Sequence, residues 1–145
     1  MQVCVFCSLI DKSVEDAFYQ DEYVLVMLDK DWAVKGHTLV IWKEHHLNAS
    51  DLSLRQFRYF SEIYYEVEKA LLDILRLPRA LTLKTGGLVG HFHFHCYPVP
   101  QSTDWKTIMQ IFNKEVSESY SLEEHRQFLT LLAKRMERTG SRLKK

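Results

Sequence analysis

The sequence predicts an α+β domain in which an antiparallel sheet packs against one long helix. Short apolar runs bounded by glycine and proline predict the strands. A longer stretch repeats its apolar side chains at three- and four-residue steps, which is typical of an amphipathic helix. The length of 145 residues suits one domain with its own core. Strands followed by helical segments favour the α+β class over a parallel α/β sheet.

The first half of the chain predicts two strands and the long helix. Residues 23–28 and 37–42 are apolar and β-branched, and they pair in antiparallel fashion if the polar residues between them form a hairpin. Apolar residues then recur at helical spacing over 57–75. Asp51 or Ser53 can cap the start of this helix, and Pro78 ends it.

The second half predicts two more strands, over 80–85 and 91–97, with a turn or bulge between them. Pro98 and Pro100 should close the second of these strands.

The pattern of the last forty or so residues predicts helices. Residues 103–113 are ambiguous, with a helix favoured. Ser121 and Glu124 resemble a capping box that opens a final helix.

Composition and charge limit the classes of partner and the cellular compartment that we expect for this protein. The 19 basic and 19 acidic residues give a formal net charge of zero, which offers no electrostatic reason for a nucleic-acid or membrane partner. No apolar run approaches the roughly 20 residues of a membrane span. The start of the chain lacks the pattern of a secretory signal. Three cysteines favour a reducing compartment, so we expect a cytoplasmic protein.

A C-x2-C pair, Cys4 and Cys7, has the spacing with which two thiolates bind one tetrahedral ion, and thiolate softness favours zinc. The alternative is a pair of ordinary buried cysteines. A closed site needs two more ligands, for which His45 and His91 are candidates and His46 is the substitute for His45.

Three histidines alternate with two phenylalanines over His91–His95, and in a strand they would share one face. Such a row suits a three-histidine catalytic metal site, nucleophilic catalysis by one imidazole, or inert phosphate binding. A histidine-rich surface strand is the less favoured alternative, because strands seldom give alternate positions to one titratable residue type. Glycines just before the row expose backbone N–H groups that can approach phosphate oxygens.

These motifs resemble the histidine triad (HIT) superfamily of nucleotide hydrolases and transferases. Residues 91–97 match its H-φ-H-φ-H-φ-φ signature, where φ is apolar, and residues 36–41 resemble its G-H-x-L-V-I strand. Members that bear zinc also begin with C-x2-C. The resemblance covers roughly residues 1–100, as one HIT-like nucleotide-binding catalytic domain with about five antiparallel strands. Residues 101–145 are left as a C-terminal helical extension that we expect to pack on the same domain.

The resemblance implies a role for each histidine of the row. His93 is expected to attack the α-phosphorus of a purine nucleotide conjugate, a dinucleoside polyphosphate or a phosphoramidate. A nucleotidyl-histidine intermediate would form, which water resolves. His95 would donate to a phosphate or leaving-group oxygen. His91 would join Cys4, Cys7 and His45 around a structural zinc ion.

The resemblance also implies the substrate-binding residues. An acidic residue eight positions before His37 lies where the family binds ribose, and the loop before the triad contacts phosphate. The expected substrate-binding residues are Asp29, Lys30, Gly86, Gly87 and Leu88.

The chain departs from the family pattern just before the triad, where Gly86-Gly87-Leu88-Val89 lacks the usual amide and hydroxyl side chains. Leu88 therefore supports an alternative, a non-catalytic nucleotide-binding or regulatory module. A zinc hydrolase that uses all three histidines is a third hypothesis. Many relatives are twofold dimers, so we expect a homodimer, although the exposed stripe of the long helix could instead pack beneath the extra C-terminal helix.

Overall fold

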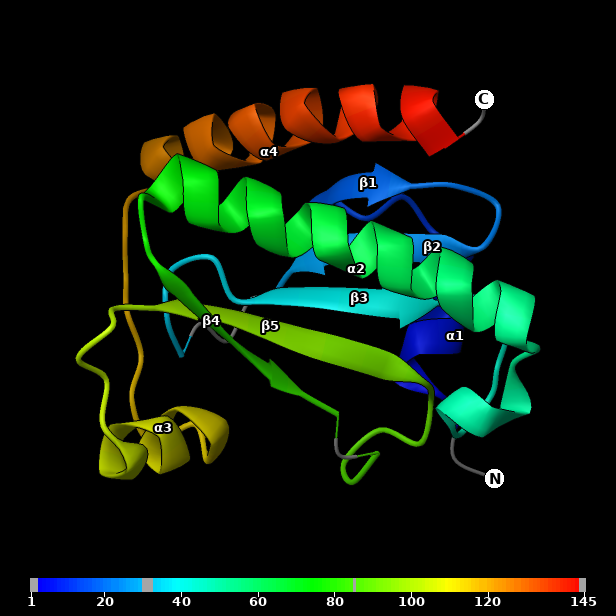
Figure 1. Cartoon of the computed structure of the whole chain (residues 1–145), viewed down its shortest axis with the longest axis horizontal. Coiled ribbons are helices and arrows are strands. Elements are labelled where there is room, and N and C mark those ends of the chain that lie inside the picture. Colours follow the sequence, from blue (N-terminus) through cyan, green and yellow to red (C-terminus); the bar gives the residue numbers. More distant parts are fainter. Residues whose placement is uncertain (1–2, 30–32, 85, 144–145) are drawn as a thin grey trace.

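The computed structural model describes residues 3–29, 33–84 and 86–143, with side chains described up to Thr139. Five antiparallel strands form one sheet in the order β1-β2-β3-β5-β4 (Figure 1). They are β1 (Ala17–Gln20), β2 (Val24–Leu28), β3 (Thr38–Trp42), β4 (Arg79–Leu83) and β5 (His93–Val99). The expected α+β fold, with its sheet, its long helix and its C-terminal helix, is confirmed.

The long helix α2 (Leu54–Leu75) covers one face of the sheet (Figure 1). It starts where Ser53 Oγ accepts the Gln56 backbone N–H at 3.1 Å, while the Ser53 backbone N–H donates to Gln56 Oε1 at 2.8 Å. It ends at Arg76, which has a left-handed conformation with φ of 55°. Alternate strand residues meet its apolar face, so the main core lies between α2 and the sheet.

A short helix, α1 (Val5–Ile10), lies on the opposite face of the sheet. Its buried Phe6 packs against the other set of alternating strand residues, which are Leu25, Met27, Leu39 and Ile41. Cys4 is the residue before this helix and Cys7 lies in its first turn. The face that carries α1 is therefore also the face toward which the cysteines can project.

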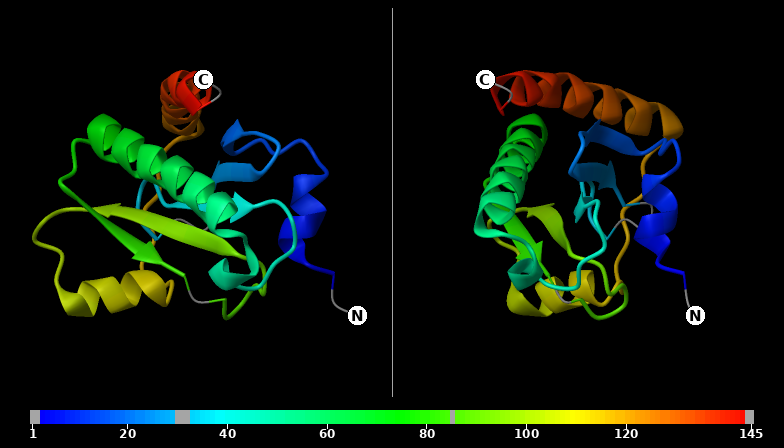
Figure 2. Two further views of the ribbon diagram at one scale, coloured as in Figure 1. Left: turned by 45° about the vertical axis from the view of Figure 1, so that its right-hand side comes forward. Right: turned by 90° about the vertical axis from the view of Figure 1, so that its right-hand side faces the viewer.

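The C-terminal residues form α3 (Trp105–Phe112) and α4 (Leu122–Leu143). Asp104 caps α3 by accepting the Thr107 N–H at 2.8 Å. Ser121 and Glu124 form the expected capping box at the start of α4. Helix α4 lies across α2 and β1 (Figure 2). Three of its side chains, Phe128, Leu132 and Met136, join the core cluster that contains Phe60 and Ile63 of α2.

Three features of the backbone differ from the sequence predictions. Helix α1 and strand β1 were not predicted, because six and four residues are too short to show a period. Residues 91 and 92 precede the β5 ladder, although the sequence predicts them to be part of the strand. Pro98 lies within β5 rather than ending it. The pairing of β5 with β3 stops at Cys96, so the missing N–H of Pro98 costs no hydrogen bond to β3.

Gly36 allows the β2–β3 connection to reach the end of α2. Its φ is +89°, and a Cβ atom there would lie 2.8 Å from Leu75 Cδ1 and 3.2 Å from Pro98 Cγ. Only glycine fits this approach, which places His37 immediately before β3. Among the described residues, none of the helices combines the length and apolarity that a membrane span requires.

Candidate functional site

Four potential metal ligands converge beside α1, although they come from three distant parts of the chain. The ligand atoms of Cys4, Cys7, His45 and His91 all lie within 4.8 Å of one another. The Nδ1 atom of His91 is 3.4 Å from Cys4 Sγ and 3.6 Å from Cys7 Sγ. The Nδ1 atom of His45 is 3.3 Å from Cys7 Sγ. Two thiols and two imidazoles at these separations could hold one metal ion in a tetrahedral set.

The backbone orients His91 toward the two thiols. Its Nε2 lies 2.5 Å from the carbonyl oxygen of Trp42, which can only accept, so the proton resides on Nε2. The lone pair of Nδ1 is thereby directed at Cys4 and Cys7. A hydrogen bond behind the ligating nitrogen is the arrangement that metal sites use to fix an imidazole. Burial of the ring lowers the pKa of His91, which keeps it neutral and able to ligate.

His46, the substitute candidate, points elsewhere. Its Nε2 is 3.2 Å from the carboxylate of Glu44, and the ring contributes no atom to the cluster. The Phe92 N–H donates to the His46 carbonyl at 2.6 Å. This bond turns residues 91 and 92 toward the 42–46 segment, which explains why His91 leaves the strand ladder and meets His45.

A second group of histidines lies along the same face of the sheet. His93 Nε2 is 3.2 Å from His95 Nε2, and His95 Nδ1 is 2.9 Å from His37 Nε2. His37 Nδ1 is 3.6 Å from Asp29 Oδ2. The β3–β5 register explains the grouping, because His93 and His95 pair with Ile41 and Leu39 on the α1 side of the sheet.

The hydrogen bonds of this group assign its protons. His93 Nδ1 lies 2.6 Å from the carbonyl oxygen of His91, so Nδ1 carries the proton and Nε2 carries the lone pair. His95 must then donate its Nε2–H to His93. Its own Nδ1 must accept, and the donor is the Nε2–H of His37. One backbone carbonyl thus sets the direction of the whole chain of imidazoles.

The imidazoles of His93 and His95 favour the neutral state. Burial is the main cause of the lowered pKa of His93, and the charge of Lys84 adds to it. Burial lowers the pKa of His95 to about 3, with His37 and His93 as further causes and Lys114 as a smaller one. The carboxylate of Asp29 opposes both shifts. A neutral His93 keeps a lone pair on Nε2 for attack on an electrophile.

The three histidines of the row do not act on one metal in this structure. His91 belongs to the cysteine cluster, whereas His95 belongs to a separate group with Asp29 and His37. Within the part of the chain that the structure describes, His93 joins neither set of possible ligands. This separation of His91 from His95 speaks against the hypothesis of a three-histidine catalytic metal.

The expected substrate-binding residues are less closely grouped. Asp29 is half-buried at the end of the imidazole chain, and its N–H donates to the His37 carbonyl at 2.9 Å. Gly86, Gly87 and Leu88 form an exposed loop in which Gly86 has a φ of +61° and Leu88 is 93% exposed. Lys30 lies outside the described residues.

Sequence reasoning missed His37 and Tyr97 as members of the site. His37 marked only the start of a strand, and Tyr97 only the final apolar position of the triad motif. The Tyr97 ring stacks on His37 with centroids 4.0 Å apart and an interplanar angle of 21°. Knowledge that β3 pairs with β5 would have placed His37 and Tyr97 side by side, but this pairing is set by the tertiary fold.

Comparisons with known proteins agree with this geometry. The HIT domain matches residues 11–101. The chain is 32% identical over 115 residues to Protein hit of Bacillus subtilis, which covers 72% of this chain and 79% of that relative. It is 27% identical over 115 residues to HINT4 of Arabidopsis thaliana, a bifunctional adenosine 5'-phosphosulfate phosphorylase/adenylylsulfatase, which covers 74% of this chain and 77% of that protein.

A solved structure shares the fold. It is that of a zinc-bound histidine triad family protein from Mycobacterium smegmatis, with a TM-score of 0.67, 22% identity and coverage of 95% of this chain and 96% of that chain. The match over residues 11–101 includes Asp29, His37, His93 and His95, the members of the imidazole chain. The chain therefore belongs to the HIT domain family.

Proposed function

We propose that the protein cleaves a purine nucleotide conjugate at its α-phosphate, with His93 as the nucleophile. The observation that best supports this proposal is the hydrogen bond from His93 Nδ1 to the His91 carbonyl. It leaves the lone pair of the ring on Nε2. The Nε2 atom of His95 lies 3.2 Å away, and its proton can be donated at that position. Family membership supports the reaction class, and the nucleotidyl chemistry in the name of the Arabidopsis relative agrees with it.

The proposed reaction has two displacements at phosphorus. His93 Nε2 forms a bond to the α-phosphorus while the bond to the leaving group breaks, and His95 gives its Nε2 proton to the leaving atom. Water then attacks the phosphorus, the P–N bond breaks, and the proton of the water passes to His95. Both histidines return to their starting states. The Nε2–H of His37, which donates to His95 Nδ1 at 2.9 Å, holds His95 in the donating orientation.

The same proposal assigns the binding residues. Asp29 accepts hydrogen bonds from the ribose hydroxyls, and Gly86, Gly87 and Leu88 contact phosphate through backbone N–H groups. Lys30 is proposed as a further substrate-binding residue. A homodimer stays a prediction. Tyr65 of α2 is 62% exposed, whereas Ile63 is fully buried in the cluster that α4 completes.

We infer that the metal at the cysteine cluster is a structural zinc ion. The set of two thiols and two imidazoles leaves no position open for substrate, which is typical of structural zinc. The zinc-bound relative from Mycobacterium smegmatis supports this assignment. When bound, zinc supplies a cross-link between α1, the chain after β3 and the start of the triad. Reduced thiols are required for it, so we propose a reducing compartment, the cytoplasm.

An experiment on the intact protein tests the reaction. Denaturing the protein rapidly during turnover of a radiolabelled adenosine conjugate should leave adenylate attached to His93, because a P–N bond is stable to base but not to acid. Mapping the label by mass spectrometry identifies the residue. The alternative function, a regulatory nucleotide-binding module, is favoured by the exposed Leu88 in place of an amide or hydroxyl. It predicts nucleotide binding with no label and no product.

The pKa shift of His93 sets the expected pH dependence. Because burial lowers the pKa of His93, the ring stays neutral below the usual histidine value of 6.5 and retains its lone pair. We expect kcat/KM to stay level from about pH 8 to about pH 6.5 and to fall only at lower pH. Rates measured across this range in buffers of constant ionic strength check this. A fall already centred above 6.5 would contradict a buried, neutral nucleophile.

The charges around the triad favour an anionic leaving group. Lys84 and Lys114 lie near enough to His93 and His95 for their charges to lower the pKa of these rings. Replacing Lys114 with methionine should reduce kcat/KM about fivefold for diadenosine tetraphosphate, and less than about twofold for adenosine phosphoramidate, whose leaving group is neutral ammonia. Lys106→Met, on the exposed part of α3, is the matched control. Equal losses on both substrates would reject the polyphosphate preference.

A further inference from the structure

Tyr97 lies directly behind the two histidines that continue the imidazole chain from His93. Its ring stacks on His37 at 4.0 Å and 21°, and on His95 at 5.7 Å and 12°. Tyr97 itself is only 3% exposed. Flat contact with a buried aromatic ring restricts rotation of both imidazoles. The position of Tyr97 therefore helps to set the directions in which the ring nitrogens of His37 and His95 point.

The C-terminal extension holds Tyr97 in place. Phe112, at the end of α3, contacts the Tyr97 ring with centroids 5.3 Å apart. Tyr97 and Ile111 belong to one apolar cluster with Ala33 and Val34. Ala33 and Val34 precede His37 by only a few residues. The cluster therefore joins α3, the triad strand and the chain that leads into His37.

A second part of the extension holds the next residue of that chain, Lys35. The Lys35 backbone N–H donates to Glu118 Oε2 at 3.0 Å. Its ammonium lies 5.2 Å from the ring centroid of Tyr120 and 5.8 Å from that of Phe128. Both the main chain and the side chain of Lys35 thus contact residues 118–128, which lie beyond the matched HIT domain.

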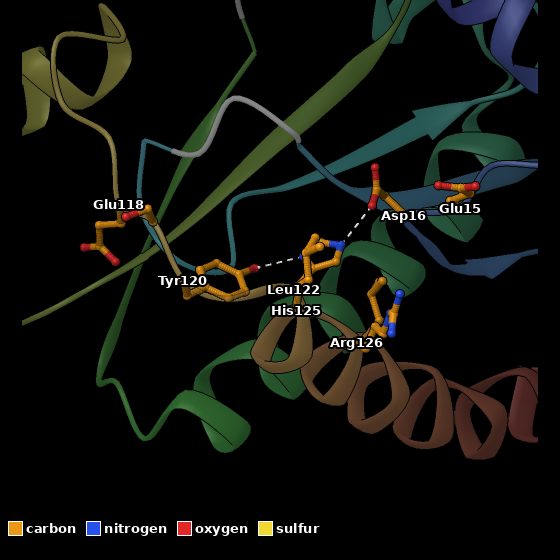
Figure 3. Close-up of a pocket in the computed structure, with 9 residues that line it drawn as sticks. Glu15, Asp16, Glu118, Tyr120, Leu122, His125 and Arg126 are labelled. Carbon is orange, nitrogen blue, oxygen red and sulfur yellow. Dashed lines mark hydrogen bonds and ion pairs between the residues drawn. The ribbon is translucent and has the colours of Figure 1, made fainter.

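This second part is itself tied to the sheet. Figure 3 shows the Tyr120 hydroxyl bonded to His125 Nδ1 and His125 Nε2 bonded to Asp16, at 3.3 Å and 2.9 Å. The Asp16 carbonyl accepts the N–H of Leu28, the residue before Asp29, at 3.0 Å. Asp16, Tyr120 and His125 line a cavity of about 660 Å³ whose described lining residues include none of the triad. The extension therefore contacts the β2–β3 connection directly at Lys35, and it is linked through Asp16 to Leu28 at the other end.

We propose that the C-terminal extension positions the candidate nucleotide site, with Tyr97 as the positioning residue against which His37 and His95 are held. The expected effect on the reaction rate rests on the proposed function. The expected effect on the orientation of His37 and His95 does not. Misplacing a proton donor by a fraction of an ångström lowers the rate of a step that requires alignment. Support of this kind also gives residues 102–143 a role that the triad motif does not include.

The test compares Tyr97→Leu with Tyr97→Phe in the full chain. Leucine fills part of the volume without a flat face, whereas phenylalanine keeps the ring. We expect Tyr97→Leu to lower kcat about tenfold with little change in KM, and Tyr97→Phe to stay within about twofold of the original protein. The imidazole ¹⁵N and ¹H signals of His37 and His95 should shift in the leucine variant only. Phe18→Leu, in β1 at the far edge of the sheet, controls for loss of a buried aromatic ring.

A variant of the second contact separates binding from catalysis. Glu118→Ala should raise KM severalfold with kcat unchanged, because the connection between Asp29 and His37 loses its support, and Glu118→Gln should keep KM near the original value. Unchanged histidine signals in Tyr97→Leu would overturn the proposal. So would an equal loss of activity in Tyr97→Leu, Tyr97→Phe and Phe18→Leu. If the histidine signals shift as expected but no variant and no original protein turns over a nucleotide, positioning stands and the proposed function fails.

Discussion

Replacing His93 with asparagine should lower turnover by at least about a thousandfold and abolish labelling by adenylate, because the proposed P–N bond forms at His93 Nε2. Asparagine is suited to this test because its side-chain NH₂ can still donate to the His91 carbonyl, as His93 Nδ1 does at 2.6 Å. The buried position is thereby filled, and the nucleophilic lone pair is lost. Product formation and label are measured on the same preparation.

His46→Asn is the matched control for this change. His46 lies close in the chain to a cluster ligand, but its ring contacts the exposed Glu44 and supplies no ligand atom to either group. Its replacement should leave turnover within about twofold of the original protein. The metal content and melting temperature of His93→Asn should also be unchanged. Persistent turnover with an intact fold in His93→Asn would defeat the assignment of the nucleophile.

Replacing Cys4 with serine should remove bound zinc and destabilise the fold. A hydroxyl is a poor zinc ligand, and loss of one ligand of four weakens a closed tetrahedral site strongly. We expect the free energy of unfolding to fall by roughly 2–4 kcal/mol, which for a domain of this size corresponds to a melting temperature lower by on the order of 10 °C. Zinc content by atomic emission and thermal unfolding by circular dichroism provide the two measurements.

Two controls isolate the contribution of the metal. Cys96→Ala removes a buried cysteine outside the cluster and should leave the zinc content intact. A chelator should lower the melting temperature of the original protein toward that of Cys4→Ser and leave the variant unchanged. Equal melting temperatures with and without zinc would show that the ion does not stabilise the fold. Loss of all turnover from a protein that stays folded without metal would instead support the zinc hydrolase hypothesis.

The elements with long or repeated patterns could be predicted from the sequence. Helix α2 repeats its apolar positions over 22 residues, and Ser53 supplies a local cap. Both signals are local, so they can be read without knowledge of the rest of the fold. Strand β1 has only four residues, and its place at the sheet edge is set by pairing with β2. Pro98 was wrongly expected to close β5, because its tolerance depends on where the pairing with β3 stops, which is at Thr38, the first residue of β3.

The candidate metal cluster was also predictable, but the reason for its geometry was not. The spacing of Cys4 and Cys7 identifies half of a site, and the family resemblance supplies His45 and His91. The choice of His45 over His46 follows from the structure, since only the His45 ring turns toward the thiols. The Trp42 carbonyl, which orients His91, is a main-chain group that no sequence motif reveals.

The sequence by itself determined the type of fold, the cysteine half of the candidate metal site and the alternation that puts His93 and His95 on one face. These depend on periods of two and 3.6 residues and on side-chain identity, which are local properties. Only the tertiary structure separated His91 from the other two histidines, added His37 to the chain and placed Tyr97 and the C-terminal extension behind it. Those relations depend on strand register and on contacts between residues far apart in the chain, which local patterns do not encode.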